Sequence, residues 1–473
     1  MTCDAESGFR FTGKQLAGFI GGAVVLAVAV LMPETTVSHG AIMSLGVLLA
    51  CVFMWFCGSM STGVVGLVGC FLLFVFNVQP TFGDAFSGFT QPTTWFVLGV
   101  YCMTALMQHS TLGIRLTRRF VIWARADSRK LVLAVMLATA LCSSIMTDTG
   151  AVALSMSFAL PLLNAVGVRK GESNLGKCLL MGIAIGSCIG GFTTPCGHSL
   201  NVLSIGLVES LTGESIGFLS WMAYGVPCAV AMLPIAWLSL VRAFPPEAIA
   251  ESDVQALLDG SFRVGKFSTT DKKCLVIMLL LLTLWVLGNW ITWLDPTMVA
   301  LLGMFLLFVP GINIVSWKDF EGLASWNLFL FFGGILSIGA AIKGTGMADC
   351  IAAAFLDSGI MDFPALAALI LIAAFLYLLQ TFCPIAPAWC TIFLPPLVMY
   401  AQAIGLSVAC PTFLIVALMA GSYLVPLCPA MNMTYDAGYY RFGELAKGGW
   451  LPSIALVLTI PLWSYALGVL MVV

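Results

Sequence analysis

The sequence predicts an all-α polytopic membrane protein with about 11 transmembrane helices, two re-entrant hairpins and two inverted repeats. The first observation behind this prediction is composition: 60% of the 473 residues are hydrophobic, 9% are charged, and the mean hydropathy is +1.04. A soluble domain carries about 25% charged residues, so a surface this poor in charge must face lipid. The other two observations are the spacing of the apolar stretches and the positions of the basic residues.

Apolar stretches long enough to span a bilayer recur along the whole chain, because a helical span needs roughly 20 mostly apolar residues. The first of them, 15–32, is followed by further spans and is therefore predicted to be a retained helix, not a cleaved signal peptide. Two pairs of stretches, 131–167 and 364–405, are joined by very short tips. Such tips cannot cross the headgroups and return, so each pair is predicted to be a re-entrant hairpin.

Lysine and arginine predict the orientation. If the N-terminus is cytoplasmic and both hairpins enter and leave on one side, every basic residue except Lys343 falls on the cytoplasmic face. The C-terminus is then extracytoplasmic, the first hairpin enters from the cytoplasm and the second from outside. This pattern predicts an integral protein of the cell membrane, surrounded by membrane lipid.

The two halves of the chain resemble each other. Gly113 matches Gly346, and Asn201 matches Asn432, at nearly constant offsets, as do Pro161 and Pro395. An odd number of spans in each half would invert one repeat relative to the other, which is the plan of many secondary transporters. The predicted organisation is an N-terminal segment with the first helix (1–40), a first repeat (41–242), a cytoplasmic linker (243–273) and a second repeat (274–473).

Two predicted helices, 178–205 and 411–434, contain helix-breaking residues near their middles. Proline removes a backbone donor and clashes with the preceding turn, so each helix is predicted to break there. The freed N–H and C=O groups need partners, which a substrate or an ion can supply. The breaking residues are Gly190, Gly191, Pro195 and Gly197 in the first helix, and Pro426 and Pro429 in the second.

The hairpin tips, 143–150 and 381–387, would supply the other half of such a site. A helix N-terminus carries about half a positive charge and free N–H donors. Two tips and two broken helices therefore predict an anion site that needs no lysine or arginine. Hydroxyl groups such as those of Thr147, Thr149 and Thr194 would complete it.

Several classes of function are excluded or disfavoured by the same sequence. Three histidines leave no metal cluster, and no segment carries a Ser–His–Asp or paired-carboxylate arrangement, so an enzyme is not predicted. The absence of a basic face argues against nucleic acid as a partner. The 16 cysteines lie mostly inside apolar stretches, which favours packing over disulfides or transition-metal sites.

At this level of detail the chain resembles a known family, the divalent-anion/sodium symporters (the DASS or SLC13-type family), which carry dicarboxylates, citrate or sulfate. The resemblance covers nearly the whole chain. The segment 143–149 reads SxxxTDT where the family has S-x-x-x-S-N-T. The other matching segments are DAFSGF (84–89), STLGIRL (110–116), IGGFTTPCGHSLN (189–201), FFGGILSIGAAIKGTGMAD (331–349) and PLCPAMN (426–432).

The resemblance implies a scaffold domain that forms a homodimer and a transport domain that moves as an elevator. It also implies a small anionic substrate and sodium as the coupling ion, with no organic cofactor. The first sodium site would comprise Ser143, Thr147, Asp148 and Gly197, and the second Thr381, Pro384, Ala386 and Cys428. For the substrate, the resemblance implies contacts from Thr149, His198, Pro387 and Pro429. The other candidate substrate-binding residues are Thr147, Asp148, Thr194, Asn201, Ile385, Ala386 and Asn432.

Two departures from the family pattern bear on coupling. Asp148 stands where the family has asparagine, which adds a negative charge to the first ion site. In the second tip, Ile385, Ala386 and Pro387 replace Ser-Asn-Thr and remove three polar side chains. We therefore expect the second sodium site to be weak or absent.

Asp148 and His198 leave alternatives open. A buried ionisable residue in a membrane is costly and usually functional, so Asp148 is predicted to bind a cation or proton and His198 to face the substrate. Asp148 could instead cap its helix, and His198 could be a neutral ring bonded to a carbonyl. Transport could accordingly be sodium-coupled, a sodium-independent or proton-coupled anion exchange, or, more remotely, a cation/proton antiport. Dicarboxylate, tricarboxylate, a smaller organic acid and sulfate all remain open as substrates.

Overall fold

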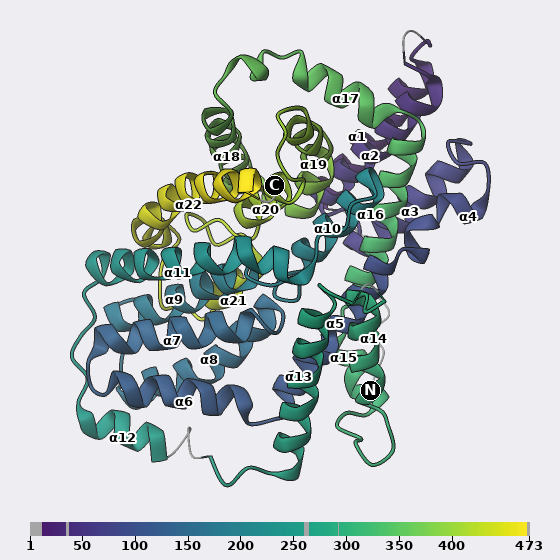
Figure 1. Ribbon diagram of the computed structural model, residues 1–473. Coiled ribbons are helices and arrows are strands. Elements are labelled where there is room, and N and C mark those ends of the chain that lie inside the picture. Colours follow the sequence, from purple (N-terminus) through teal and green to yellow (C-terminus); the bar gives the residue numbers. More distant parts are fainter. Residues whose placement is uncertain (1–11, 35–36, 260–263, 292, 471–473) are drawn as a thin grey trace. The chain divides into compact units, whose positions relative to one another are not determined.

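The computed structural model describes residues 12–34, 37–259, 264–291 and 293–470. Within these ranges the regular structure consists of 22 α-helices and two short 3₁₀ helices, without any strand (Figure 1). A helix satisfies its backbone hydrogen bonds internally, which lets an apolar chain lie in lipid. The predicted all-α fold class is confirmed.

Among the described residues, seven helices are long and apolar enough to cross a membrane. Several other apolar helices, such as α10 (Ser199–Thr212), are too short to meet that criterion. The predicted number of spans and the re-entrant course of the hairpins therefore stay predictions. The seven helices are α1 (Gly13–Leu31), α2 (His39–Cys57), α9 (Asn174–Gly191), α11 (Phe218–Ala243), α16 (Trp326–Gly344), α18 (Ala365–Phe382) and α22 (Phe442–Leu470).

The outward faces of the terminal helices are apolar. On α1, Leu16, Ile20 and Val24 recur every four residues, and each is about half exposed. Ile454 and Leu458 repeat the pattern on α22. Leaving such a side chain in water instead of an apolar environment costs about 1.5–3 kcal/mol. These stripes are therefore surfaces for lipid, as expected of an integral membrane protein.

The chain forms two compact units, one made of Met1–Thr94 with Trp326–Ala354 and the other of Trp95–Ser325 with Phe355–Val473. Each unit combines segments from both halves of the sequence, and the division into two repeats stays a prediction. The first unit contains α1, α2, α3 (Thr62–Val75), α4 (Phe82–Ala85), the 3₁₀ helix η1 (Ser87–Thr90), α16 and most of α17 (Met347–Leu356).

In the first unit, α3 and α16 approach closely because glycines lie where they cross. A Cβ atom on Gly334 would lie 2.5 Å from the Cα atom of Gly66. Asn327, at the start of α16, accepts a hydrogen bond from the backbone N–H of Gly63 at 2.8 Å. Small residues that let backbones approach are typical of helix pairs in membranes, where van der Waals packing must replace the hydrophobic effect.

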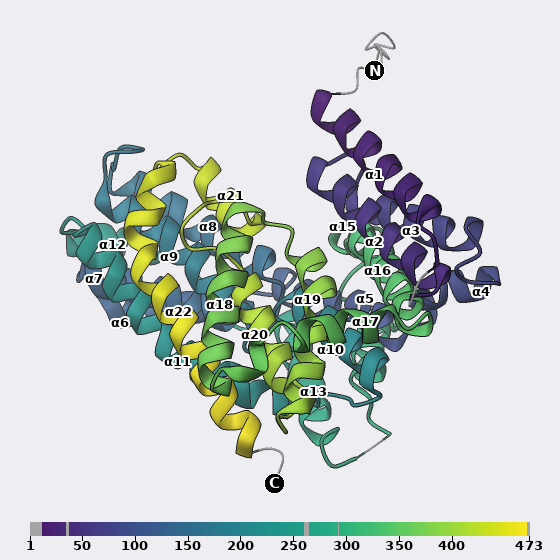
Figure 2. The same ribbon diagram turned by 90° about the horizontal axis from the view of Figure 1, so that it is seen from above.

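The second unit is built around α9, which is almost completely buried. Helices α7, α8 and α9 pack against one another, and Figure 1 shows them stacked beneath α11. Figure 2 shows α18 beside α22. The unit's remaining helices are α5 (Pro92–Gln108), α6 (Leu112–Ala124), α7 (Ser128–Ser143), α8 (Asp148–Ala165), α10, α12 (Glu251–Asp259), α13 (Thr269–Leu287), α14 (Pro296–Leu306), α15 (Trp317–Leu323), η2 (Ile360–Asp362), α19 (Ala386–Ala403), α20 (Ala409–Met419) and α21 (Pro429–Asp436).

Two helix pairs and two interrupted helices lie at the positions where the sequence places hairpins and breaks. Helices α7 and α8 are separated only by 144–147, and α18 and α19 only by 383–385. The chain leaves the helical path at 192–198, between α9 and α10, and at 420–428, between α20 and α21. We call these two stretches the first and second interruptions.

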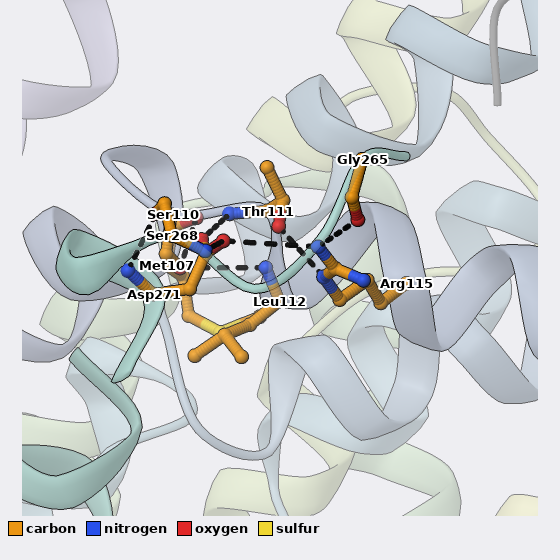
Figure 3. Close-up of polar contacts among 8 residues, drawn as sticks. All are labelled: Met107, Ser110, Thr111, Leu112, Arg115, Gly265, Ser268 and Asp271. Atoms are coloured by element: carbon orange, nitrogen blue, oxygen red, sulfur yellow. Dashed lines mark hydrogen bonds and ion pairs between the residues drawn. The ribbon is translucent and has the colours of Figure 1, made fainter. Parts of the chain in front are cut away.

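The end of the predicted linker is fastened to the start of α6 through a buried carboxylate (Figure 3). Asp271, only 2% exposed, accepts the backbone N–H of Thr111 at 2.7 Å and that of Ser268 at 3.0 Å. Arg115 lies 3.8 Å from the same carboxylate and donates to the carbonyl of Gly265 at 2.7 Å. Burial by itself would raise the pKa of Asp271, but these hydrogen bonds outweigh it and lower the pKa to about 2.

Replacing Asp271 with asparagine is expected to destabilise the protein at neutral pH. A pKa lowered from 3.8 to about 2 corresponds to about 2 kcal/mol of stability. Because the folded-state pKa is depressed, this contribution is present above pH ~4 and is lost as pH falls towards 2. Thermal denaturation in detergent should therefore show a lower Tm for Asp271→Asn at pH 7 and a shrinking difference at acid pH. The exposed Asp259→Asn serves as the control, and an equal Tm for Asp271→Asn and the parent at pH 7 would contradict the expectation.

Candidate functional site

The first hairpin tip and the first interruption meet backbone to backbone. Ser143, the last residue of α7, is fully buried, and its hydroxyl donates to the carbonyl of Ser187 at 2.7 Å. The hydroxyl of Thr194 donates to the carbonyl of Ser144. Gly197 is in close contact, because a Cβ atom there would lie 2.6 Å from the carbonyl oxygen of Ser143. Two predicted ion-site residues, Ser143 and Gly197, therefore touch.

Asp148 and His198 form an ionisable pair at the centre of this region. Asp148 is the first residue of α8, and His198 is the N-cap of α10. The Oδ2 atom of Asp148 lies 3.4 Å from the Nε2 atom of His198, and both side chains are largely buried. The Nδ1 atom of His198 accepts the backbone N–H of Leu200 at 3.0 Å. In a neutral ring the proton must then be on Nε2, facing the carboxylate.

The hydrogen bonds of His198 differ from those of a ring that donates to a carbonyl through Nδ1. Its ring accepts from a backbone N–H and does not donate to a carbonyl through Nδ1. Asp148 lies in the first turn of its helix, where a negative charge is favourable, and its carboxylate faces a partner 50 residues away in the sequence. The contact links the N-termini of α8 and α10, the two helices that begin at the first tip and the first interruption.

Asn201 forms hydrogen bonds with the backbone of the first interruption and with the residue just before it. It is fully buried, and its Nδ2 atom donates to the carbonyls of Gly191 at 2.8 Å and Thr194 at 2.6 Å. Its amide orientation is therefore fixed, since a flip would set oxygen against two carbonyls. Among the described residues the Oδ1 atom of Asn201 has no hydrogen-bond partner. A buried acceptor without a partner is costly, and a bound donor or cation would relieve that cost.

Thr104, on α5, belongs to the same region and was not predicted. Its hydroxyl is buried and has no partner within the part of the chain that the structure describes. Its methyl carbon and the hydroxyl of Thr147 both lie within 3.5 Å of the position of a Cβ atom on Gly150. The internal repeat contained a signal for it, because Thr104 aligns with Ser337 at the offset that pairs Gly113 with Gly346.

The second tip is less polar. Ile385, Ala386 and Pro387 begin α19 with apolar side chains, and the exposed Pro384 precedes them. Thr381, the one hydroxyl among the predicted residues here, is buried and lies 3.0 Å from the hydroxyl of Ser422 in the second interruption. The second tip thus contacts the second interruption, as the first tip contacts the first.

Cys428 connects the second interruption with α9. It is the N-cap of α21, and a Cβ atom on Gly421 would lie 2.8 Å from the sulfur of Cys188 and 3.5 Å from that of Cys428. Pro429 and Asn432 are exposed on α21, and Asn432 donates to the carbonyl of Leu427 at 3.4 Å.

The predicted residues therefore form two groups within one compact unit. The helices that carry them pack together, because α10 contacts α19 and α20, and α21 contacts α8 and α9. Thr149 lies beside Asp148 in the first turn of α8, half-buried. The first group contains Ser143, Asp148, Thr194, Gly197, His198 and Asn201, and the second contains Thr381 with Ser422 and Cys428 with Cys188.

Comparisons with known proteins agree with this architecture. A family profile described as the sodium:sulfate symporter transmembrane region matches residues 14–472. The chain is 23% identical over 483 residues to the sodium-dependent dicarboxylate transporter SdcS of Staphylococcus saprophyticus, covering 96% of this chain and 91% of the relative. It is 23% identical over 407 residues to the L-tartrate/succinate antiporter of Escherichia coli K12, covering 80% of each.

Two solved structures share the fold. The Alcanivorax borkumensis YdaH transporter superposes with a TM-score of 0.55 at 16% identity, covering 90% of this chain and 98% of that one. MtrF of Neisseria gonorrhoeae superposes with a TM-score of 0.58 at 11% identity, covering 97% and 95%. Identities this low establish similarity of fold alone.

Proposed function

Since the chain belongs to the sodium:sulfate symporter family, whose members are transporters and not enzymes, we propose that it is a secondary active transporter of small organic anions of the di- or tricarboxylate type. The observation that supports this most is the meeting of two hairpin tips with two interrupted helices in one unit. Helix N-termini of α8, α10, α19 and α21 begin there, and their N–H groups favour negative charge.

The substrate would be held without a basic side chain. The tips and interruptions contain no lysine or arginine, so backbone dipoles and hydroxyls must attract the anion. Thr147 and Thr149 would supply hydroxyls, and His198 would face a carboxylate. Thr194, whose hydroxyl donates to the carbonyl of Ser144, would hold the first interruption against the first tip. The buried Oδ1 atom of Asn201 is an acceptor, so it would take a hydroxyl of the substrate or the cation and not a carboxylate. The remaining contacts would come from Asp148, Ile385, Ala386, Pro387, Pro429 and Asn432.

Sodium would couple transport at the first tip. Oxygen ligands suit a hard cation, and Ser143, Thr147 and Asp148, with the backbone at Gly197, provide several there. The corresponding residues of the second tip, Thr381, Pro384, Ala386 and Cys428, offer few side-chain oxygens. We therefore propose one sodium ion per transport cycle, with elevator-type alternating access.

The wider arrangement is proposed on the same basis. The chain would form a homodimer in the cell membrane, with a cytoplasmic N-terminus and an extracytoplasmic C-terminus. The repeats 41–242 and 274–473 would be inverted relative to each other, joined by the linker 243–273. The distribution of basic residues supports this orientation.

A second candidate is anion exchange without sodium, or with protons as the coupling ion. It is favoured by the Asp148–His198 contact and by the apolar second tip. The E. coli relative is an antiporter by name. A cation/proton antiporter on the same scaffold is more remote, because the tips present helix N-termini that favour anions.

Uptake into proteoliposomes separates these candidates. We expect labelled dicarboxylate or tricarboxylate uptake to rise with an inward sodium gradient and to remain low when choline replaces sodium. If the protein is an exchanger, uptake should instead require an anion inside the proteoliposomes and should not depend on sodium. Uptake of neither type for any organic anion or sulfate would contradict the proposal, and two or more sodium ions per turnover would contradict coupling at the first tip alone.

A further inference from the structure

The second tip contains a buried hydrogen-bonded network of hydroxyl groups. The hydroxyls of Thr381 and Ser422 lie 3.0 Å apart, and those of Tyr377 and Ser453 lie 2.7 Å apart. The hydroxyl of Tyr377 also accepts the backbone N–H of Tyr423 at 3.0 Å. All five residues are at most 6% exposed, so the network is shielded from water.

The direction of each bond in this network follows from its neighbours. The hydroxyl of Ser453 donates to the carbonyl of Gly449 at 2.7 Å, so Tyr377 must be the donor in its bond to Ser453. The hydroxyl of Thr381 donates to the carbonyl of Tyr377 at 2.8 Å, so Ser422 must donate to Thr381. Every hydroxyl proton is thus used. A fully satisfied buried network holds its members in one arrangement.

This network joins three elements. Tyr377 and Thr381 lie on the last turns of α18 before the second tip, Ser422 and Tyr423 lie in the second interruption, and Ser453 lies on α22. The contacts therefore fasten the base of the second tip to the second interruption without any bound group.

Beside the first tip, by contrast, two buried polar side chains have an oxygen atom without a hydrogen-bond partner. The Oδ1 atom of Asn201 and the hydroxyl of Thr104 are buried without a partner among the described residues. Near the second tip, the side-chain oxygen of Gln380 is also buried without a partner among the described residues. Its Nε2 atom donates to the carbonyl of Met419 at 3.2 Å. The hydroxyls of Thr381 and Ser422 at the second tip are thus already paired with protein groups, whereas two buried side-chain oxygens beside the first tip are not.

We propose that the network of Tyr377, Thr381, Ser422 and Ser453 holds the second tip against the second interruption in place of a cation. The second half of the site is then formed before any ion binds, and sodium orders the first tip alone. This inference rests on the proposed transport function and specifies how its two tips differ.

Alkylation of Cys383 tests the proposal. Cys383 lies at the second tip and is half-buried, and its modification by a maleimide in the purified full-length protein can be followed by mass spectrometry of its peptide. We expect the rate to change less than about twofold between sodium and choline. Tyr377→Phe deletes both the donor to Ser453 and the acceptor for the backbone N–H of Tyr423. It should raise the rate at least about fivefold in either salt, the effect of losing at least one buried hydrogen bond.

Tyr224→Phe is the matched control, because Tyr224 is equally buried and its hydroxyl has no partner in the described structure. It should leave the rate unchanged. Sodium slowing the modification of the parent protein fivefold or more would overturn the proposal, as would equal rates for Tyr377→Phe and the parent. The assay uses no substrate, so a failure of anion uptake and a failure of this inference remain distinguishable.

Discussion

Replacing Asp148 with asparagine is expected to raise the sodium concentration for half-maximal uptake by about 10- to 100-fold, the effect of losing one charge-assisted contact. Asp148 provides the one formal negative charge of the first tip and first interruption. Its carboxylate is largely buried, so solvent screens it little. The measurement is the initial rate of uptake into proteoliposomes as a function of sodium.

Two further variants sharpen this experiment. Asp436→Asn, at the exposed end of α21, removes a carboxylate from the second interrupted helix and should leave sodium dependence unchanged. His198→Asn retains a side chain that can cap Leu200 but loses the ring that faces Asp148. If the contact matters, the effects of Asp148→Asn and His198→Asn should not add. Unchanged sodium and pH dependence in Asp148→Asn would exclude a coupling role.

The elements around the site could be predicted because their signals are local. Proline and glycine at 190–197 and 426–429 indicated where the two helices break. The short tips between the apolar stretches likewise indicated where the paired helices turn. The sequence also singled out Asp148 and His198, since ionisable residues are rare in an apolar chain. That they face each other could not be predicted, because the contact depends on how α8 and α10 pack.

Other features depend on contacts between distant residues and carry no local signal. Tyr377 and Ser453 are 76 residues apart in the sequence, and each alone is an ordinary polar residue in an apolar helix. Thr104 was missed because a threonine in a span is usually satisfied by its own helix. The division into two compact units could not be predicted from the order of the elements in the sequence, because each unit draws on both halves of the chain.

Replacing Gly197 with alanine is expected to abolish most uptake. A Cβ atom there would lie 2.5 Å from the carbonyl oxygen of Gly191 and 2.6 Å from that of Ser143. Both are backbone atoms, so neither can swing aside as a side chain would. Either the first tip or the first interruption must move, and overpacking of this kind costs about 1–3 kcal/mol.

The displacement would act where the proposed ion ligands of the first tip meet. We therefore expect at least a tenfold loss of uptake, because a ligand set held by backbone contacts loses its geometry when the backbone shifts. Gly443→Ala is the control, since a Cβ atom there meets nothing within 4 Å. Size-exclusion chromatography separates a misfolded variant from a folded one with a displaced tip. A folded Gly197→Ala protein with normal uptake and sodium dependence would mean that ions and substrate bind elsewhere.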